Sequence, residues 1–290
     1  MKKSIALLTV LGFIILIISI STAILKIYEK YSSSSYSYIS QNSLVLKNIT
    51  NILNNTLQSI NGSEIKNIFN TYPPIVSKDG NFILNIKILP INNKININNL
   101  IENNKTNNYI LNTISNILEY YQILDPLFFE DLLLDTIDKD NLERSADSEI
   151  ILLNKNFQNG QIYNYHHLKK ILDYYASIKD DKTIYKIPWE KYLFFGENKK
   201  YILDCNLLSK ELATFIGLEI KNDIISCKNI QIDENKKIIK NLHIQAFDKN
   251  SSYLIKIKAN YILNNQNNTL NFIYDTKEKK VVSVENNFIY

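Results

Sequence analysis

The sequence predicts an α+β protein in which a helical block is inserted between two groups of β-strands. Apolar and polar residues alternate near residues 80–98 and again across residues 223–290, whereas apolar residues recur every three to four positions between residues 100 and 218. A long apolar stretch precedes all three blocks. Because strands bracket the helical block, we interpret it as an insertion into one domain.

The N-terminal segment has the length of a transmembrane helix. After Met1–Ser4, residues 5–25 form an uncharged stretch of about 21 residues, close to the roughly 20 that cross a bilayer core. A secretory signal peptide has a shorter apolar region, roughly 7–15 residues. Lys2 and Lys3 favour a cytoplasmic N-terminus. Helical spacing continues over residues 46–60, so we expect one long N-terminal helix whose first half is in the membrane.

The first strands are predicted between Asp79 and Asn98, with alternation over residues 82–88 and a turn before a second strand at Ile95 and Ile97. Helical spacing predicts four helices, at Tyr109–Leu124, Leu127–Ile137, His167–Ser177 and Ser209–Gly217. Alternation then predicts a meander of strands at Leu242–Ala246, Tyr253–Tyr261, Leu270–Tyr274 and Val282–Val284. We expect both groups of strands to share one antiparallel sheet.

These patterns divide the chain into five parts. They are a leader (1–4), a transmembrane segment (5–25), a core helix with the first strands (26–98), an inserted helical domain (99–218) and the C-terminal strands (219–290).

Composition and motifs exclude several classes of function. The 290 residues carry a net charge of only +4, and Arg144 is the only arginine, so a nucleic-acid partner is not expected. The sequence contains no glycine-rich phosphate loop, no HExxH and no nucleophile elbow. His166 and His167 are adjacent and would point apart on a helix. We therefore expect no enzyme activity.

An acidic cluster is the most informative chemical feature. Its members lie within nineteen residues around Arg144: Asp131, Asp135, Asp138, Asp140, Glu143, Asp147 and Glu149. Asp138, Asp140 and Glu149 fit positions 1, 3 and 12 of an EF-hand loop, but Glu143 stands at position 6, where glycine is needed. The sequence thus leaves two alternatives: a looser calcium loop, or a solvated acidic turn that Arg144 neutralises in part.

The two cysteines, Cys205 and Cys227, also leave two alternatives. In an exported domain they can form a disulfide that closes a loop of about 22 residues, which would add roughly 3 kcal/mol of stability. Otherwise they are two buried thiols on separate elements. Their spacing does not suggest a metal site.

Several segments, in order along most of the chain, carry a family resemblance. They are Lys3–Leu11, Lys94–Leu100, Leu134–Asp140 with Arg144–Glu149, and Leu203–Leu212. Together they resemble the leader and the internal motifs of the minor pseudopilin K family of type II secretion systems. Ser4 stands where the family's leader usually has glycine, and Ala146 and Asp147 replace the paired glycines of the acidic motif.

The resemblance implies a pilin-like fold and a non-enzymatic subunit at the tip of a periplasmic pseudopilus, active in protein export across the outer membrane. Prepilin peptidase would cut between Ser4 and Ile5, and the new N-terminus would be methylated. Thr9 would be the fifth mature residue, where other pilin-like subunits have glutamate. The protein would cross the inner membrane once and assemble with minor pseudopilins I and J and the other pseudopilus subunits.

The resemblance also implies a calcium site. Asp138, Asp140 and Glu149 would be ligands, with Asp135 as a further candidate. Two other functions stay open at this point: a minor pilin of a related type IV filament, and a membrane-anchored periplasmic enzyme or binding protein of unknown ligand.

Overall fold

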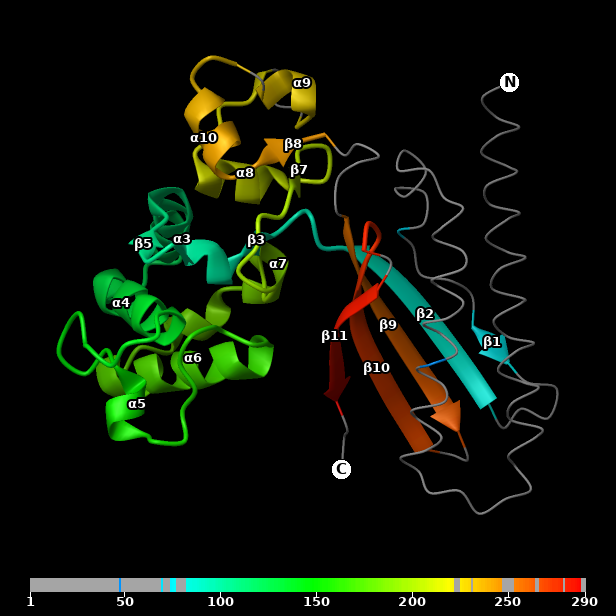
Figure 1. Ribbon diagram of the computed structural model, residues 1–290, viewed down its shortest axis with the longest axis horizontal. Coiled ribbons are helices and arrows are strands. Elements are labelled where there is room, and N and C mark those ends of the chain that lie inside the picture. The colour runs from blue at the N-terminus through cyan, green and yellow to red at the C-terminus, as the bar shows by residue number, and fades with distance from the viewer. Residues whose placement is uncertain are drawn as a thin grey trace. The chain divides into compact units, whose positions relative to one another are not determined.

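The computed structural model describes residues 47, 69, 74–76, 82–221, 225–230, 232–246, 253–263, 266–278 and 280–287. The chain divides into two compact units (Figure 1). Unit 1 is built from Met1–Ile91 and Phe247–Tyr290, and unit 2 from Asn92–Ala246. The predicted leader and transmembrane segment lie outside the described residues, as does the apolar stripe of residues 46–60 except for Lys47. Among the helices that are described, none combines the length and the apolar character needed to cross a bilayer.

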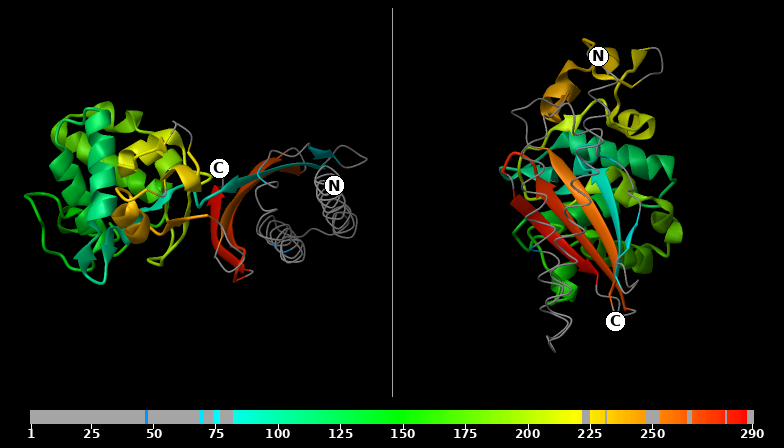
Figure 2. Two further views of the ribbon diagram at one scale, coloured as in Figure 1. Left: turned by 90° about the horizontal axis from the view of Figure 1, so that it is seen from above. Right: turned by 90° about the vertical axis from the view of Figure 1, so that its right-hand side faces the viewer.

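Unit 1 contains a five-stranded antiparallel sheet with the order β1-β2-β9-β10-β11. Its strands are β1 (Ile75–Val76), β2 (Phe82–Pro90), β9 (Leu254–Leu263), β10 (Gln266–Asp275) and β11 (Lys280–Asn287). Figure 2 shows the four long strands side by side in a curved sheet. A change of register between Ile273 and Tyr274 interrupts the pairing of β10 with β11.

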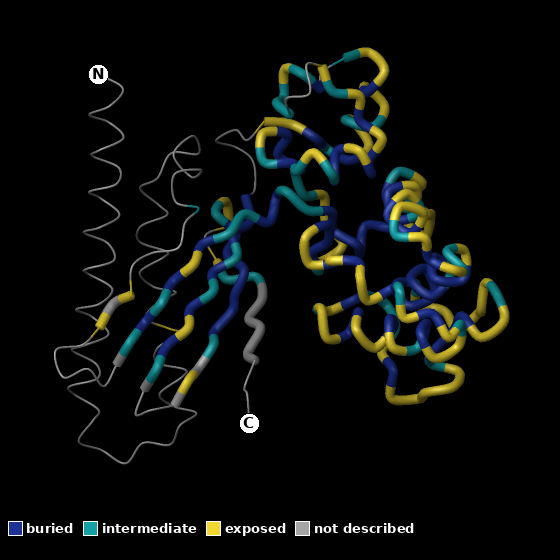
Figure 3. Tube along the Cα trace, turned by 180° about the vertical axis from the view of Figure 1, so that it is seen from behind, coloured by how far each residue is buried: buried dark blue, intermediate teal, exposed yellow. Residues whose placement is uncertain are grey.

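The register of β2 explains the alternation in the sequence. Leu84, Ile86 and Ile88 are buried, whereas Lys87 is exposed. Figure 3 shows the alternation of buried and more exposed residues along the long strands. Ile86 pairs with Ala259 of β9, which is also buried. The predicted α+β class and the shared sheet of β2 with the three C-terminal strands are therefore confirmed.

The prediction of a second strand at Ile95 and Ile97 in the same sheet is wrong. Ile95–Asn96 forms β3, which pairs in parallel with β6 (Leu193–Phe194) inside unit 2. Ile97–Leu100 is a 3₁₀ helix, η2, and the Asn96 side chain accepts from the Asn98 amide at its start. Capping by Asn96 bends the chain away from an extended conformation, although the apolar alternation continues.

Unit 2 is mainly helical. Its helices are α3 (Asn108–Tyr120), α4 (Pro126–Ile137), α5 (Ile150–Leu153), α6 (Tyr165–Lys179), η3 (Lys182–Lys186), α7 (Trp189–Tyr192), α8 (Lys210–Ile216), α9 (Cys227–Ile230) and α10 (Lys236–Asn241). Its remaining short strands are β4 (Ile101–Glu102), β5 (Lys105–Thr106), β7 (Leu203–Asp204) and β8 (Ile244–Gln245). The four predicted helices correspond to α3, α4, α6 and α8.

Side chains just outside these helices fix where they begin and end. Asn107, Asp125, Asn164 and Ser209 each accept a hydrogen bond from a backbone amide in the first turn of α3, α4, α6 and α8, respectively. Gly217 ends α8 with a φ of 81°, a left-handed conformation that glycine adopts without strain. The predicted stop at Gly217 is confirmed.

Unit 2 is larger than the predicted insertion of residues 99–218, because residues 219–246 belong to it as well. The described part of this segment forms α9 and α10 and then β8, which pairs in parallel with β7. The alternating apolar residues Leu242 and Ile244 suggested a strand of the large sheet. Instead Ile244 is buried in the core of unit 2.

An aromatic cluster forms the centre of the core of unit 2. The Phe129 ring stacks on Trp189 with centroids 5.5 Å apart, and it meets Tyr175 edge-on at 5.4 Å. All three side chains are fully or almost fully buried. Edge-on and stacked aromatic pairs add to the stabilisation that burial alone provides.

We predict that Phe129→Ala lowers the free energy of unfolding of unit 2 by about 3–5 kcal/mol, because it leaves a cavity against Trp189 and Tyr175. Trp189 is the only tryptophan, so its fluorescence during denaturation reports on unit 2. Leu127→Ala is the control, because Leu127 is 71% exposed and should change stability by less than about 0.5 kcal/mol. Equal losses in the two variants would contradict this account of the core.

Candidate functional site

The acidic loop, residues 138–149, connects α4 to α5, which pack against each other. Asp138 is the C-terminal cap of α4, and its backbone amide donates to the carbonyl of Leu134 at 3.0 Å. Glu149 is the N-terminal cap residue of α5 and makes no side-chain capping bond. Two of the predicted ligands thus mark the two ends of the loop.

Arg144 folds the acidic loop onto α4. Asp135, in the last turn of α4, has an exposure of 0%. Its carboxylate accepts hydrogen bonds from the Arg144 backbone amide at 3.1 Å, from the Arg144 guanidinium and from the Ser148 hydroxyl. The same guanidinium nitrogen, Nη1, lies 2.5 Å from Asp138 Oδ2. Arg144 therefore neutralises part of the cluster.

Several oxygen atoms around the loop are buried without a hydrogen-bond partner. They are Thr136 Oγ1, Asp138 Oδ1, Ser145 Oγ, Glu149 Oε2 and Asn159 Oδ1. Glu149 is 1% exposed, and its other carboxylate oxygen accepts from the Asn159 amide at 2.6 Å. Buried polar atoms are normally paired, so a group of unpaired oxygens calls for water or a cation.

The charges of the acidic loop also indicate a place for a cation. Asp135, Asp138 and Glu149 carry three negative charges when ionised, and Arg144 supplies one positive charge. Burial raises the pKa of Asp138, and the hydrogen bond from Arg144 offsets only part of that effect. Burial likewise raises the pKa of Glu149, with Asn159 as the partial offset. A hard divalent cation with oxygen ligands would relieve this repulsion.

The four predicted ligands do not form a single carboxylate cage. Asp135 is occupied by Arg144 and Ser148, and Asp140 is exposed with Oδ1 accepting from the Leu142 amide at 2.9 Å. Among the described residues, no three carboxylates of the acidic loop bring their oxygens within 4.8 Å of one another. Asp138 and Glu149 are the members with an unpaired buried oxygen.

A cleft of about 620 Å³ gives solvent access to one side of the acidic loop. It is lined mostly by polar and charged side chains: Asn103, Asn104, Thr106, Asp138, Lys139, Asp140, Arg144, Gln161 and Asn198. A hydrated ion can therefore reach Asp138 from solvent. An entry path is one requirement for a metal site.

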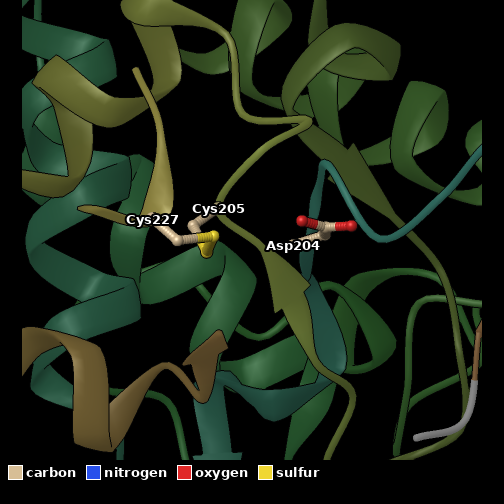
Figure 4. A group of neighbouring side chains, drawn as sticks. All are labelled: Asp204, Cys205 and Cys227. Atoms are coloured by element: carbon tan, nitrogen blue, oxygen red, sulfur yellow. A yellow bond between two sulfur atoms is a disulfide. The ribbon is translucent and has the colours of Figure 1, made fainter. Parts of the chain in front are cut away.

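Cys205 and Cys227 form a disulfide that joins the residue after β7 to the first residue of α9 (Figure 4). Asp204 precedes Cys205, and their two side chains with that of Cys227 form the one described set of three His, Cys, Asp or Glu residues whose ligand atoms lie within 4.8 Å. The disulfide leaves no thiolate to bind a metal. Here the bond closes the loop that carries α8.

Strand β7 holds both ends of unit 2. The Asp204 amide donates to the carbonyl of Asn92 at 2.7 Å, and the Cys205 amide donates to the carbonyl of Gln245 at 3.3 Å. Asn92 and Gln245 lie at the two ends of unit 2, and they are thus hydrogen-bonded to two consecutive residues, Asp204 and Cys205. The disulfide at Cys205 attaches α9 to the same point.

The asparagines of the Lys94–Leu100 motif have a structural role that the sequence did not reveal. Asn98 accepts from the Ile162 amide at 2.7 Å and donates to the carbonyls of Ile162 and Gly196 at 3.0 and 2.8 Å. Asn96 and Asn99 hold the backbone of residues 196–199 in the same way. These buried amides fix a loop by bonding its backbone groups.

Ser4 and Ile5, the predicted processing site, lie outside the described residues. Asn159 was missed as a candidate site residue because it lies ten positions beyond Glu149 in a polar loop. The Asn159-Gly160 pair is a turn signal that could have drawn attention to it.

No family model matches this sequence, and no curated protein matches it. Among solved structures, the fold is similar to a chain from the crystal structure of the GspK-GspI-GspJ complex of the enterotoxigenic Escherichia coli type 2 secretion system. The TM-score is 0.54, and the match covers 91% of this chain and 99% of that chain at 12% sequence identity. The likeness shows a shared fold.

We predict that Arg144→Met lowers the stability of unit 2 by about 2–3 kcal/mol. The change leaves the buried Asp135 without its charge partner, and the loss is below the 3–5 kcal/mol of a fully buried pair because 35% of the arginine side chain is exposed. Denaturation followed by Trp189 fluorescence measures it.

The control is Lys169→Met, which breaks the exposed ion pair with Asp173 and should cost less than about 1 kcal/mol. Adding Asp135→Asn to Arg144→Met should restore part of the loss, since no unpaired charge is then buried. A double variant no more stable than Arg144→Met alone would argue against an electrostatic origin.

Proposed function

We propose that this chain is a minor pseudopilin of a type II secretion system, an assembly subunit without catalytic activity. The observation that carries the proposal is the extent of the structural match, which covers 91% of this chain and 99% of its neighbour. A match of that extent includes both the sheet of unit 1 and the helical unit inserted into it. A sheet alone would be weaker support, because many unrelated proteins share small antiparallel sheets.

Within that class, we propose the role of the K subunit at the tip of the pseudopilus. The internal motifs that resemble this family fall at structurally defined points. Lys94–Leu100 carries the buried asparagines, Leu134–Glu149 spans the end of α4 and the acidic loop, and Leu203–Leu212 contains β7 and the disulfide cysteine. Thr9, in place of glutamate, fits a subunit with no neighbour ahead of it.

The proposed partners are minor pseudopilins I and J and the other pseudopilus subunits. The similar structure is that of a complex of GspK with GspI and GspJ, which supports this choice. We further propose that prepilin peptidase cuts before Ile5, that the new N-terminus is methylated, and that residues 5–25 anchor the chain in the inner membrane with both units in the periplasm.

We predict that the full-length chain, tagged at its C-terminus and expressed with the I, J and major pseudopilins of the same genome, purifies as a complex with I and J. The control is co-expression with the minor pilins of a type IV filament, which should not bind. The intact mass of the purified chain also shows whether Met1–Ser4 has been removed.

Two outcomes would contradict the proposal. Purification with the type IV pilins would move the chain to that filament class. Purification of the chain alone would favour an anchored enzyme or binding protein.

We also propose that unit 2 binds one Ca²⁺ ion at the acidic loop. The support comes from the unpaired buried oxygens of Asp138 and Glu149 and from the excess of negative charge over Arg144. Calcium accepts six to eight oxygen ligands with flexible geometry, so water from the cleft and Asp140 can supply others. Bound calcium would neutralise the loop and hold α4 to α5.

We predict that calcium at a hundredfold excess over its Kd stabilises unit 2 by about 2.7 kcal/mol relative to chelator, because the ion binds the folded loop and not the unfolded chain. Thermal unfolding of the full-length chain, followed by Trp189 fluorescence, measures the shift. Asp138→Ala should abolish the response, whereas Asp173→Ala, at an exposed position on α6, should keep it. A melting temperature that calcium does not change would reduce the site to an acidic turn neutralised by Arg144.

A further inference from the structure

We infer that Asn159 is a direct ligand in the proposed cation site, supplied by a second loop, and that Asp135 is not a ligand. The buried donors contributed by side chains would then be Asp138 Oδ1, Glu149 Oε2 and Asn159 Oδ1. This inference rests on the proposed calcium site and assigns its donors. It differs from the set of four carboxylates that the sequence predicts.

The position of Asn159 follows from contacts on both sides. Its Nδ2 donates to Glu149 Oε1 at 2.6 Å, which fixes the side chain against the carboxylate at the start of α5. The next residue, Gly160, donates its backbone amide to the carbonyl of Thr136 at 2.9 Å, two residues before Asp138. The loop of residues 154–161 is thereby held against both ends of the acidic loop.

Asn159 has one amide oxygen left after these contacts, and it is buried without a partner. Glu149 Oε2 is likewise buried without a hydrogen-bond partner, and the whole residue is only 1% exposed. The Asn159 and Glu149 side chains are hydrogen-bonded to each other, and each keeps one buried acceptor oxygen that no donor reaches. Such a pair of oxygens is unfavourable in the absence of a cation and is a usual part of an oxygen-ligand site for calcium.

Asp135 is excluded as a donor because its oxygens already accept three hydrogen bonds. Two come from Arg144 and one from Ser148. Binding a metal there would displace the guanidinium from a carboxylate with 0% exposure. Asp135 and Arg144 are therefore positioning residues that hold Asp138 at the edge of the site.

Terbium luminescence tests the inference on the full-length chain. Tb³⁺ replaces calcium at oxygen sites, and Tyr174 can sensitise it, since its hydroxyl donates to the carbonyl of Asp147 at 2.8 Å. Luminescence lifetimes in H₂O and D₂O give the number of water molecules on the ion. Asn159→Ala should weaken Tb³⁺ binding on the order of tenfold and add about one bound water.

Two further variants sharpen the experiment. Asn156→Ala changes an exposed asparagine of the same loop and should leave both the affinity and the water count as in the wild type. Asn159→Asp replaces the amide with a carboxylate, so it should keep the wild-type water count while destabilising the metal-free protein by repulsion from Glu149.

The outcomes separate the two proposals. Weaker binding of Tb³⁺ to Asn159→Ala with an unchanged water count would overturn the inference, because Asn159 would then only position Glu149. A wild-type chain that binds no Tb³⁺, or one whose Tb³⁺ luminescence is not competed away by calcium, would overturn the calcium site itself. Neither result would bear on assembly with other pseudopilins.

Discussion

Unit 1 depends on one non-local contact, the antiparallel pairing of β2 with β9. Every residue from Phe82 to Pro90 has a partner in β9, yet the whole of unit 2 lies between the two strands in the sequence. Closing so long a loop would be costly if the loop were disordered. Unit 2 removes much of that cost, because β7 binds the carbonyls of Asn92 and Gln245 through adjacent amides and so holds both ends of the insertion together.

The sequence predicted features that depend on local periodicity. The shared sheet, the four main helices of unit 2 and the stop at Gly217 were all visible as alternation, helical spacing or a single turn residue. The acidic loop was also visible, because charge density is a property of composition. Its interpretation was less secure, since the partner of each carboxylate is set by tertiary contacts such as that between Arg144 and Asp135.

Features that depend on pairing between distant segments were not predictable. Ile95 and Leu242 lie in alternating apolar segments, but neither belongs to the large sheet. The reason is that the residues of a short strand do not determine which other strand it pairs with. Nothing in the sequence around Asn96, Asn98 and Asn99 marks these residues for a structural role. They turn out to bond loop backbones about a hundred residues away, a role that only the fold reveals.

The hydrogen bond from Gly160 to Thr136 also bears on the chemical ageing of the protein. Asparagine followed by glycine is the pair most prone to lose ammonia, because the glycine amide nitrogen attacks the asparagine side chain to give a succinimide. Here that nitrogen is bonded to the Thr136 carbonyl at 2.9 Å, and the Asn159 side chain is held by Glu149. The folded loop therefore protects Asn159 from conversion to aspartate or isoaspartate, whereas the unfolded chain would leave it open to both.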